Sequence, residues 1–384
     1  MNSVYFDNAA TTPMYREVVE VMSEAMLNSY GNPSSTHHLG RKAKVLVESS
    51  RKKIAEYLNV LPRELVFTSS GTEANNLVLR NAVENLGVKK IITSKIEHHA
   101  VLHVVDNLNL KFEVEVEFVS LNENGEVDLS DLQDKLSSTD VPVLVSLMWV
   151  NNEIGNILPV EKVSNLCREY NAIFHTDAVQ AIGHFNIDLK NTPVDFLVGS
   201  GHKFHGPKGV GFLYANGKYN VKPMILGGGQ ERGIRSSTEN VHAVLGMQKA
   251  LEVSLVNLDE DLEEIKKLKL YFIKTLQDSI PDVRFNGSSG NLEESSVTIL
   301  NVRFPFKDKM LLFNLDLQGV CASVGSACQS GGAKVSHVLK EVLEKEELDF
   351  SSIRFSFSKF STIDEVDFVM GKIIKTYSLV RNRK

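Results

Sequence analysis

Seven short apolar stretches, separated in part by helix-like segments, constrain the fold of this chain more than any other feature. They are rich in Val, Ile and Phe, which is typical of buried strands. Between them, Thr72–Asn85 and Val160–Tyr170 carry apolar residues at helical spacing. This alternation predicts an α/β fold in which a mostly parallel sheet has helices on both faces and binds ligands beyond the carboxyl ends of its strands. The predicted strands are Glu64–Thr68, Lys90–Thr93, Glu113–Val119, Val143–Met148, Ile173–Thr176, Asp195–Val198 and Val210–Tyr214.

The pattern changes in the last third of the chain. One long helix is expected over about Thr238–Ser279, followed by strands at Ser296–Val302 and Ile353–Ser356. These elements indicate a smaller α+β domain that packs closely on the first. We expect a large domain over residues 16–255 and a small domain formed by residues 1–15 and 256–384.

Composition excludes several classes of protein. With 42% hydrophobic and 23% charged residues among 384, the chain can bury a large core and is not disordered. A net charge of −6 argues against a nucleic-acid-binding surface. The longest apolar run, Val141–Val150, is far shorter than the about 20 residues of a membrane span. The N-terminal residues predict no secretory signal, and three cysteines without a CxxC pair fit a reducing compartment. A soluble cytoplasmic protein is expected.

Lys203 follows an apolar strand on a Ser/Gly turn, in the sequence Gly199-Ser-Gly-His-Lys203. A lysine there sits where a doubly wound sheet binds its ligand, and in a buried cationic environment its amine can become nucleophilic. Taken alone, such a lysine is more often an ordinary surface residue of a turn.

Two further features border predicted strand ends. Asp177 ends a buried strand, where its carboxylate could face the pyridine nitrogen of a pyridoxal cofactor, although an N-cap of a following helix is the commoner explanation. Gly71 and Thr72 lie between a strand and a helix, where backbone N–H groups suit a phosphate; a simple capping turn is the alternative.

His99 and His103 are four residues apart, a spacing that could suggest a metal site. Because there is no HExxH motif and no nearby carboxylate set, packing or solvated histidines are favoured. His98, at a strand-to-helix turn, could instead stack on a flat cofactor.

Cys328 lies in a stretch of small residues, Gly325-Ser-Ala-Cys328-Gln-Ser-Gly-Gly. An exposed cysteine in such a loop has the access that a reactive thiol requires, whereas Cys167 and Cys321 lie in more apolar surroundings. On this feature alone, a reactive and an inert cysteine are equally supported.

Taken in order along the chain, these motifs resemble those of the cysteine desulfurases, pyridoxal-phosphate enzymes in the class V branch of the fold-type-I aminotransferases. The resemblance covers nearly the whole chain. The matching stretches are Tyr5–Pro13, Gly31–Ser34, Thr93–His98, Val150–Gly155, Gly199–Lys203, Gly227–Gly233, Gly325–Cys328 and Ser352–Ser356.

The resemblance implies a role for each matching residue. Lys203 would bind the cofactor covalently and move protons, His98 would stack on its ring, and Cys328 would take the sulfur from the substrate. Asn32 and Arg354 would hold the substrate carboxylate, and Thr238 would reach the phosphate of the partner subunit. The implied cofactor-binding residues are Gly71, Thr72, His98, Asn152, Asp177, Gln180, Ser200, His202, Lys203 and Thr238.

The implied activity is removal of sulfur from L-cysteine with pyridoxal 5′-phosphate, which yields L-alanine and a persulfide on Cys328. The implied partners are a second copy of the chain in a homodimer and a sulfur-acceptor protein. That acceptor would be an iron–sulfur scaffold or a sulfur-relay protein, with a 2Fe–2S cluster held transiently through Cys328. The sulfur would serve iron–sulfur cluster assembly or the synthesis of thio-cofactors or thiolated tRNA. The alternative activity is that of a selenocysteine lyase or another class V lyase; no metal, nucleic acid or membrane is expected.

Overall fold

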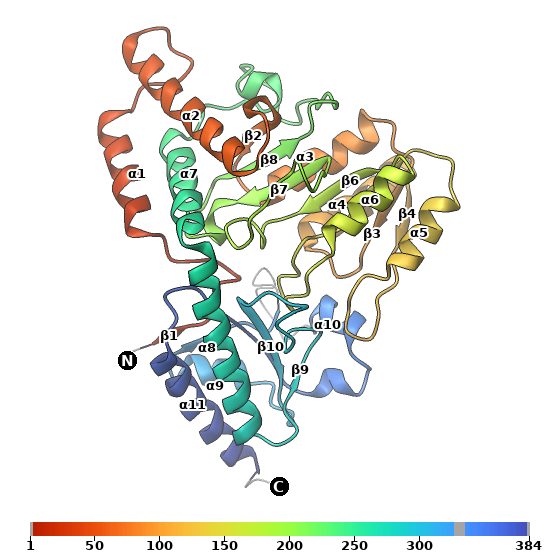
Figure 1. Cartoon of the computed structure of the whole chain (residues 1–384), viewed down its shortest axis with the longest axis vertical. Helices are drawn as coiled ribbons and strands as arrows, with labels where there is room; N and C mark the ends of the chain where they lie inside the picture. Colours follow the sequence, from red (N-terminus) through yellow and green to blue (C-terminus); the bar gives the residue numbers. More distant parts are fainter. Residues whose placement is uncertain (1–2, 326–334, 382–384) are drawn as a thin grey trace.

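The computed structural model describes residues 3–325 and 335–381 of the chain, and a seven-stranded sheet dominates it (Figure 1). The strand order is β2-β8-β7-β6-β5-β3-β4. All seven strands lie where the sequence predicts them. Their bounds are β2 Leu65–Thr68, β3 Lys90–Thr93, β4 Glu115–Phe118, β5 Val143–Ser146, β6 Ile173–Asp177, β7 Phe196–Ser200 and β8 Gly211–Ala215.

Strands β4, β3, β5, β6 and β7 pair in parallel, whereas β8 is antiparallel to both of its neighbours, β7 and β2. Residues 201–210 connect β7 to β8 and contain only one short 3-10 turn, Gly201–Lys203. A parallel pairing needs a crossover of a dozen or more residues, so this connection reverses the chain direction. The predicted mostly parallel sheet is confirmed.

Helices cover both faces of the sheet. One core cluster joins α3 (Gly71–Glu84) and α4 (His99–Phe112) to strand residues such as Ile91 and Leu144. The neighbouring residues Ile92 and Val145 point to the opposite face, into a second cluster. Because both faces are buried, the inner strands are largely apolar, whereas the edge strand β4, with the sequence Glu-Val-Glu-Phe, alternates and is not buried. The helices of the second cluster are α1 Arg16–Asn28, α2 His38–Tyr57, α5 Leu129–Ser137, α6 Val160–Glu169 and α7 Val241–Val256.

The single helix expected over Thr238–Ser279 is wrong, because the structure has two helices there. After α7 the chain leaves helical geometry at Asn257 (φ −122°, ψ 34°), and α8 runs over Leu258–Ser279. The acidic run Asp259–Asp261 fills the first turn of α8, where negative side chains are favourable beside the helix dipole. An asparagine followed by acidic residues is a recognisable helix start that the apolar periodicity had obscured.

A separate core lies under α8 and is built from the two ends of the chain. It brings Val4 and Phe6 together with Phe272 on α8 and with two small sheets. Strand β1 pairs in parallel with β11, while β10 pairs antiparallel with β9 and β12. The remaining bounds are β1 Val4–Tyr5, β9 Arg284–Phe285, β10 Ile299–Arg303, β11 Val320–Cys321, β12 Ser352–Ser356, α9 Leu311–Asp316, α10 His337–Val342 and α11 Ile363–Arg381.

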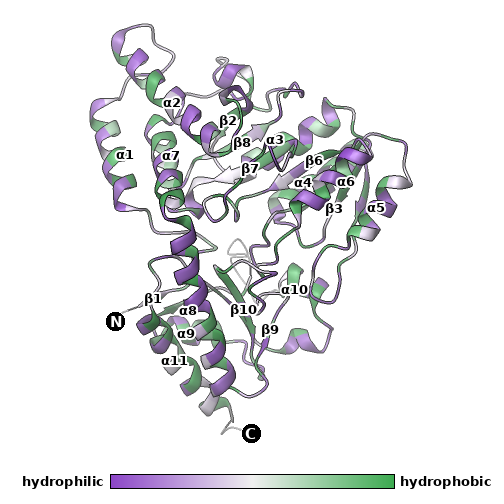
Figure 2. Cartoon of the chain, viewed as in Figure 1, coloured by the Kyte–Doolittle hydropathy of each residue, from purple (hydrophilic) through white to green (hydrophobic). Residues whose placement is uncertain are grey.

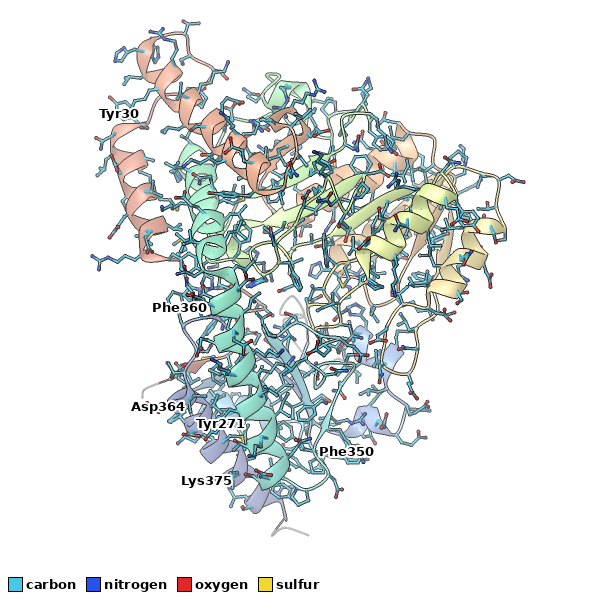
Figure 3. All side chains as sticks on the ribbon, in the orientation of Figure 1. Tyr30, Tyr271, Phe350, Phe360, Asp364 and Lys375 are labelled. Atoms are coloured by element: carbon cyan, nitrogen blue, oxygen red, sulfur yellow. The ribbon has the colours of Figure 1, made fainter. Side chains whose placement is uncertain are left out.

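The outer surface of this second core is polar. Figure 2 shows α8 with a largely hydrophilic outer side, whereas β10 behind it is hydrophobic. Tyr271 of α8 donates a hydrogen bond to Asp367 of α11 at 2.7 Å, and its side chain is labelled on the outside of α8 in Figure 3. The predicted domain boundaries stay a prediction, which the two separate cores support. In the described part of the chain, no helix is long and apolar enough to span a membrane.

His175 lies in the interior of the large sheet, on β6, two residues before its end. Its side chain is fully buried, its Nδ1 lies 2.9 Å from Ser146 Oγ, and its Nε2 has no partner in the described part of the chain. Burial lowers the pKa of this imidazole to about 3, so the ring is neutral in the folded protein.

We predict that His175 makes the fold sensitive to acid. An unfolded histidine binds a proton below about pH 6.5. Unfolding therefore takes up a proton between that pH and about 3, and the free energy of unfolding falls as the pH is lowered through this window. Denaturant titrations at several pH values should show a shallower decline for His175→Asn. His38→Asn, a change at an exposed histidine, should keep the wild-type slope; a wild-type slope in the His175 variant would contradict the prediction.

Candidate active site

A cavity of about 170 Å³ lies beyond the carboxyl ends of β6 and β7. It is bordered by residues from the sheet, from the N-terminal segment and from β12. Most of the residues that the sequence predicts for the cofactor and the substrate line it. These are Gly71, Thr72, His98, Asn152, Asp177, Gln180, Ser200, His202, Lys203 and Arg354.

The first turn of α3 forms one wall of the cavity. Ser70 caps the helix by accepting a hydrogen bond from the Glu73 N–H at 3.2 Å. The N–H groups at the start of a helix have no intrahelical partner and form a site for an anion. Gly71 is required here, because a Cβ atom would lie 2.7 Å from the Val179 side chain. The wall is thus both a helix cap and a possible phosphate site.

Asp177 ends β6 and its carboxylate is held by two neutral donors. Oδ2 accepts a hydrogen bond from Asn75 Nδ2 at 2.6 Å, and Oδ1 accepts one from the Val179 N–H at 3.0 Å. No helix begins after Asp177, so the N-cap interpretation is wrong. Sequence reasoning missed Asn75, although its place one turn after Gly71, on the buried side of α3, was a usable signal.

Lys203 ends the short 3-10 turn that follows β7, and it lines the cavity rather than an open surface. Its Nζ donates hydrogen bonds to the carbonyl oxygens of Ala9 at 2.6 Å and Ala10 at 2.9 Å. The Gln180 amide donates to the same Ala9 carbonyl at 2.9 Å. The N-terminal segment therefore forms part of the site, which its sequence alone did not indicate.

His98 is the N-cap of α4. Its Nδ1 accepts a hydrogen bond from the Ala100 N–H at 3.1 Å, which places the proton of the neutral ring on Nε2. Burial lowers the pKa of His98 despite the opposing charge of Asp177, and the Lys203 cation lowers it further. Burial, together with Lys203, also lowers the pKa of His202, to about 4. Both rings are therefore neutral near pH 7.

Three further histidines, which follow His98 in the chain or lie on α10, pack against one another. The ring of His99 lies 4.8 Å from that of His103 and 4.3 Å from that of His337, measured between centroids. Among residues 3–325 and 335–381, no group of three or more His, Cys, Asp or Glu side chains could hold a metal ion.

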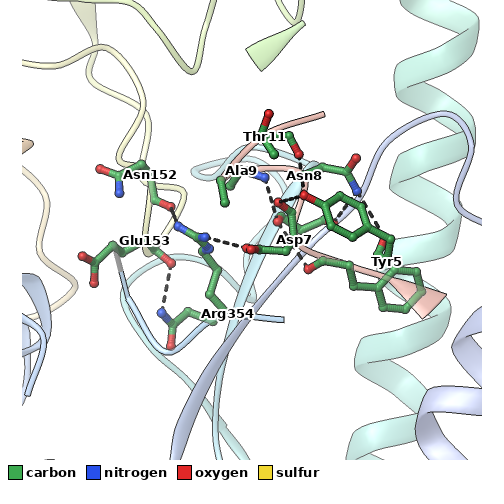
Figure 4. A network of polar contacts seen from close by, with 12 residues as sticks. Tyr5, Asp7, Asn8, Ala9, Thr11, Asn152, Glu153 and Arg354 are labelled. Carbon is green, nitrogen blue, oxygen red and sulfur yellow. Dashed lines mark hydrogen bonds and ion pairs between the residues drawn. The ribbon is translucent and has the colours of Figure 1, made fainter. Parts of the chain in front are cut away.

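Arg354 comes from β12 and its side chain is only 1% exposed (Figure 4). Nη2 pairs with Asp7 Oδ1 at 2.8 Å, and Nη1 donates to the Asn152 carbonyl oxygen at 2.8 Å. Nε is buried and has no partner among the described residues. The sequence did not reveal the pairing with Asp7, which is 347 residues away along the chain.

Three predicted residues are not part of this cavity in the described structure. Asn32 and Thr238 are exposed and do not line it. Cys328 lies outside the described residues. The chain on either side of it approaches Glu153, since Ser336 Oγ donates a hydrogen bond to the Glu153 carboxylate and Gly325 packs beside that group.

Comparisons with known proteins agree on one family. The model for "Aminotransferase class-V" matches residues 4–369. A protein of Dictyoglomus turgidum named cysteine desulfurase IscS is 40% identical over 381 residues, which cover 98% of this chain and 95% of that protein. A putative cysteine desulfurase IscS 1 of Bacillus subtilis is 41% identical, over 95% of this chain and 96% of that protein.

Solved structures give the same result. A NifS-like protein has a TM-score of 0.89 at 35% identity and covers 98% of this chain and 100% of its own. A NifS-like protein from Rickettsia africae has a TM-score of 0.87 at 32% identity, covering 98% and 99%. A structure titled "SspA in complex with cysteine" has a TM-score of 0.81 at 30% identity, covering 93% and 99%. The predicted fold-type-I architecture is confirmed, and the chain belongs to the class V aminotransferase family.

Proposed function

We propose that this protein is a pyridoxal-phosphate-dependent cysteine desulfurase, which converts L-cysteine to L-alanine and passes the sulfur to an acceptor through a persulfide on Cys328. The observation that carries the proposal is the convergence of Lys203, Asp177 and Arg354 on one cavity. Lys203 supplies an amine that can react with the cofactor aldehyde, and Asp177 supplies a carboxylate for its pyridine nitrogen. Arg354 supplies a guanidinium for the carboxylate of the substrate. The names of the relatives support the same activity.

The residues present fit pyridoxal phosphate. The N–H groups at Gly71 and Thr72 and the side chains of Ser200 and His202, which all line the cavity, would hold the phosphate. Asp177 would pair with the ring nitrogen, because its two hydrogen bonds leave further acceptor positions on the carboxylate. When bound, the group supplies an electron sink for the substrate α-carbon.

Lys203 and His98 would handle protons in this reaction. The Ala9 and Ala10 carbonyls fix Lys203 Nζ at the cavity, where the amine can bind the cofactor aldehyde and then move a proton at the substrate α-carbon. His98 would stack on the cofactor ring as a neutral imidazole, with its Nε2–H available as a donor. Asn152 and Gln180 would lie near the phenolic oxygen of the ring.

Arg354 would bind the substrate carboxylate, assisted by Asn32. The Cys328 thiolate would then form a bond to the substrate sulfur while the bond from that sulfur to Cβ breaks. Protonation of Cβ completes alanine, and the sulfur remains on Cys328 as a persulfide. Gly325 and Ser336, which flank residues 326–334, both lie beside Glu153, the neighbour of the cavity-lining Asn152.

We further propose a homodimer in a reducing, cytoplasmic setting, which delivers sulfur to an iron–sulfur scaffold or a sulfur-relay protein. Thr238 would complete the phosphate site of the partner subunit. Two buried or half-buried ion pairs hold the segment 227–238 in place: Glu231 pairs with Arg51 at 2.7 Å, and Arg235 pairs with Glu73 at 2.8 Å. Exposed apolar side chains at Leu27, Tyr30, Val45 and Leu226 also support an interface.

We predict that Lys203→Ala cannot hold the cofactor covalently. The wild-type protein should be yellow, and borohydride should fix one cofactor on the peptide that contains Lys203, as measured by mass spectrometry. The variant should yield no modified peptide. A wild-type protein that never takes up pyridoxal phosphate would overturn the proposed function.

Cys328→Ala is expected to separate sulfur transfer from cofactor binding. The variant should keep the yellow colour but release alanine from L-cysteine at least about 100-fold more slowly, because it lacks the attacking thiol. Cys321→Ala is the matched control, since that thiol is half-buried and burial raises its pKa. A Cys328→Ala variant with wild-type turnover would point to a lyase that releases sulfide or selenide directly.

The dimer has its own test. Light scattering should give twice the chain mass, and Thr238→Ala should weaken pyridoxal phosphate binding without changing that mass. The matched control is Ser130→Ala, a change in an exposed hydroxyl residue on α5. A fully active monomer would rule out a site completed across the interface.

A further inference from the structure

Asp7 is the acidic neighbour of Arg354, and the proposed function gives it no role. Its carboxylate is 17% exposed and lies 2.8 Å from Nη2 of a guanidinium that is 1% exposed. A buried guanidinium is costly unless an anion pairs with it. Asp7 supplies that anion from within the protein, before any substrate enters.

The backbone around Asp7 is fixed, so its carboxylate stays beside Arg354. The Ser356 N–H donates to the Phe6 carbonyl at 2.7 Å, and the Ala9 N–H donates to Ser356 Oγ at 2.8 Å. The Tyr5 hydroxyl donates to the Thr11 carbonyl at 2.7 Å (Figure 4). These bonds attach both sides of Asp7 to β12, the strand that carries Arg354, and close the turn after it.

The guanidinium of Arg354 keeps N–H groups for a ligand. Nη1 uses one of its two N–H groups on the Asn152 carbonyl and Nη2 uses one of its two on Asp7, whereas Nε has no partner among the described residues. A buried unpaired donor is unfavourable unless a ligand completes it. An entering carboxylate therefore meets a guanidinium with unused N–H groups and a positive charge that Asp7 already partly balances.

We propose that Asp7 determines how strongly this site holds an α-carboxylate: its charge weakens the attraction of Arg354 for the carboxylate of both substrate and product. The physical basis is repulsion between two anions that share one guanidinium. Substrate and product carry the same carboxylate, so binding it more tightly would retain the product without speeding the reaction. Asp7 is a specificity-determining residue, and this inference rests on the proposed function.

The test compares two ligands that differ only in the carboxylate, L-alanine and L-alaninamide. Their affinities for the cofactor-loaded protein are measured by titration calorimetry, with no turnover involved. Asp7→Asn keeps the shape and an acceptor for Nη2 but removes the charge. We expect it to bind L-alanine about tenfold more tightly than the wild type, with the affinity for L-alaninamide unchanged. The KM of Asp7→Asn for L-cysteine should also be lower than that of the wild type, with kcat unchanged or lower.

Two further variants make the result specific. Asp7→Glu retains the charge, so its ratio of alanine to alaninamide affinity should stay within about twofold of the wild type. Asp349→Asn removes an exposed acid that pairs with Lys307 at 2.7 Å, and it should leave the ratio unchanged.

The inference is overturned if Asp7→Asn leaves the ratio unchanged or weakens alanine binding, or if Asp7→Glu raises the ratio as strongly as Asp7→Asn. These outcomes are distinct from a failure of the proposed function. If the proposed function were wrong, the wild-type protein would release no alanine from L-cysteine, whatever the affinity ratio measured for the variants.

Discussion

The site depends on the common direction of β5, β6 and β7. Parallel strands end at the same edge of a sheet, so residues that are far apart in sequence leave those strands at neighbouring points. Asp177 ends β6, and Lys203 follows β7 after only a short turn. If β7 ran in the opposite direction, Lys203 would lie at the other edge of the sheet, and no side-chain substitution could compensate.

The sheet edge alone provides only half of the cavity, and the N-terminal segment supplies the connection to the other half. Ala9 and Ala10 accept hydrogen bonds from Lys203, while Asp7 pairs with Arg354. The N-terminal segment therefore forms hydrogen bonds with the proposed cofactor-binding lysine and an ion pair with the proposed substrate-binding arginine. This arrangement fixes the position of the two functional groups relative to each other, although they belong to different cores.

Sequence patterns predicted the parts of this structure that local physics determines. The inner strands were recognisable because burial on both faces makes them largely apolar, and Asp177 and Lys203 were recognisable because they lie at or just after the ends of such strands. The pair of Asp7 and Arg354 was not, because its partners meet only through the pairing of the N-terminal segment with β12. The break at Asn257 was missed because apolar periodicity continues across it, while the caps that end and begin helices are short-range signals.

The charged groups of the cavity differ in how they are balanced, and this difference fits the different ligands proposed for them. Asp177 accepts its hydrogen bonds from an amide and a backbone N–H, so these donors orient the carboxylate without neutralising it, as a partner for a cationic ring nitrogen requires. Arg354, by contrast, already has an anion at 2.8 Å. A resident cofactor gains from a strong, uncompensated charge, whereas a substrate that must leave after each turnover gains from a weakened one. This difference agrees with the proposed roles, in which Asp177 contacts a cofactor that stays and Arg354 contacts a ligand that is exchanged.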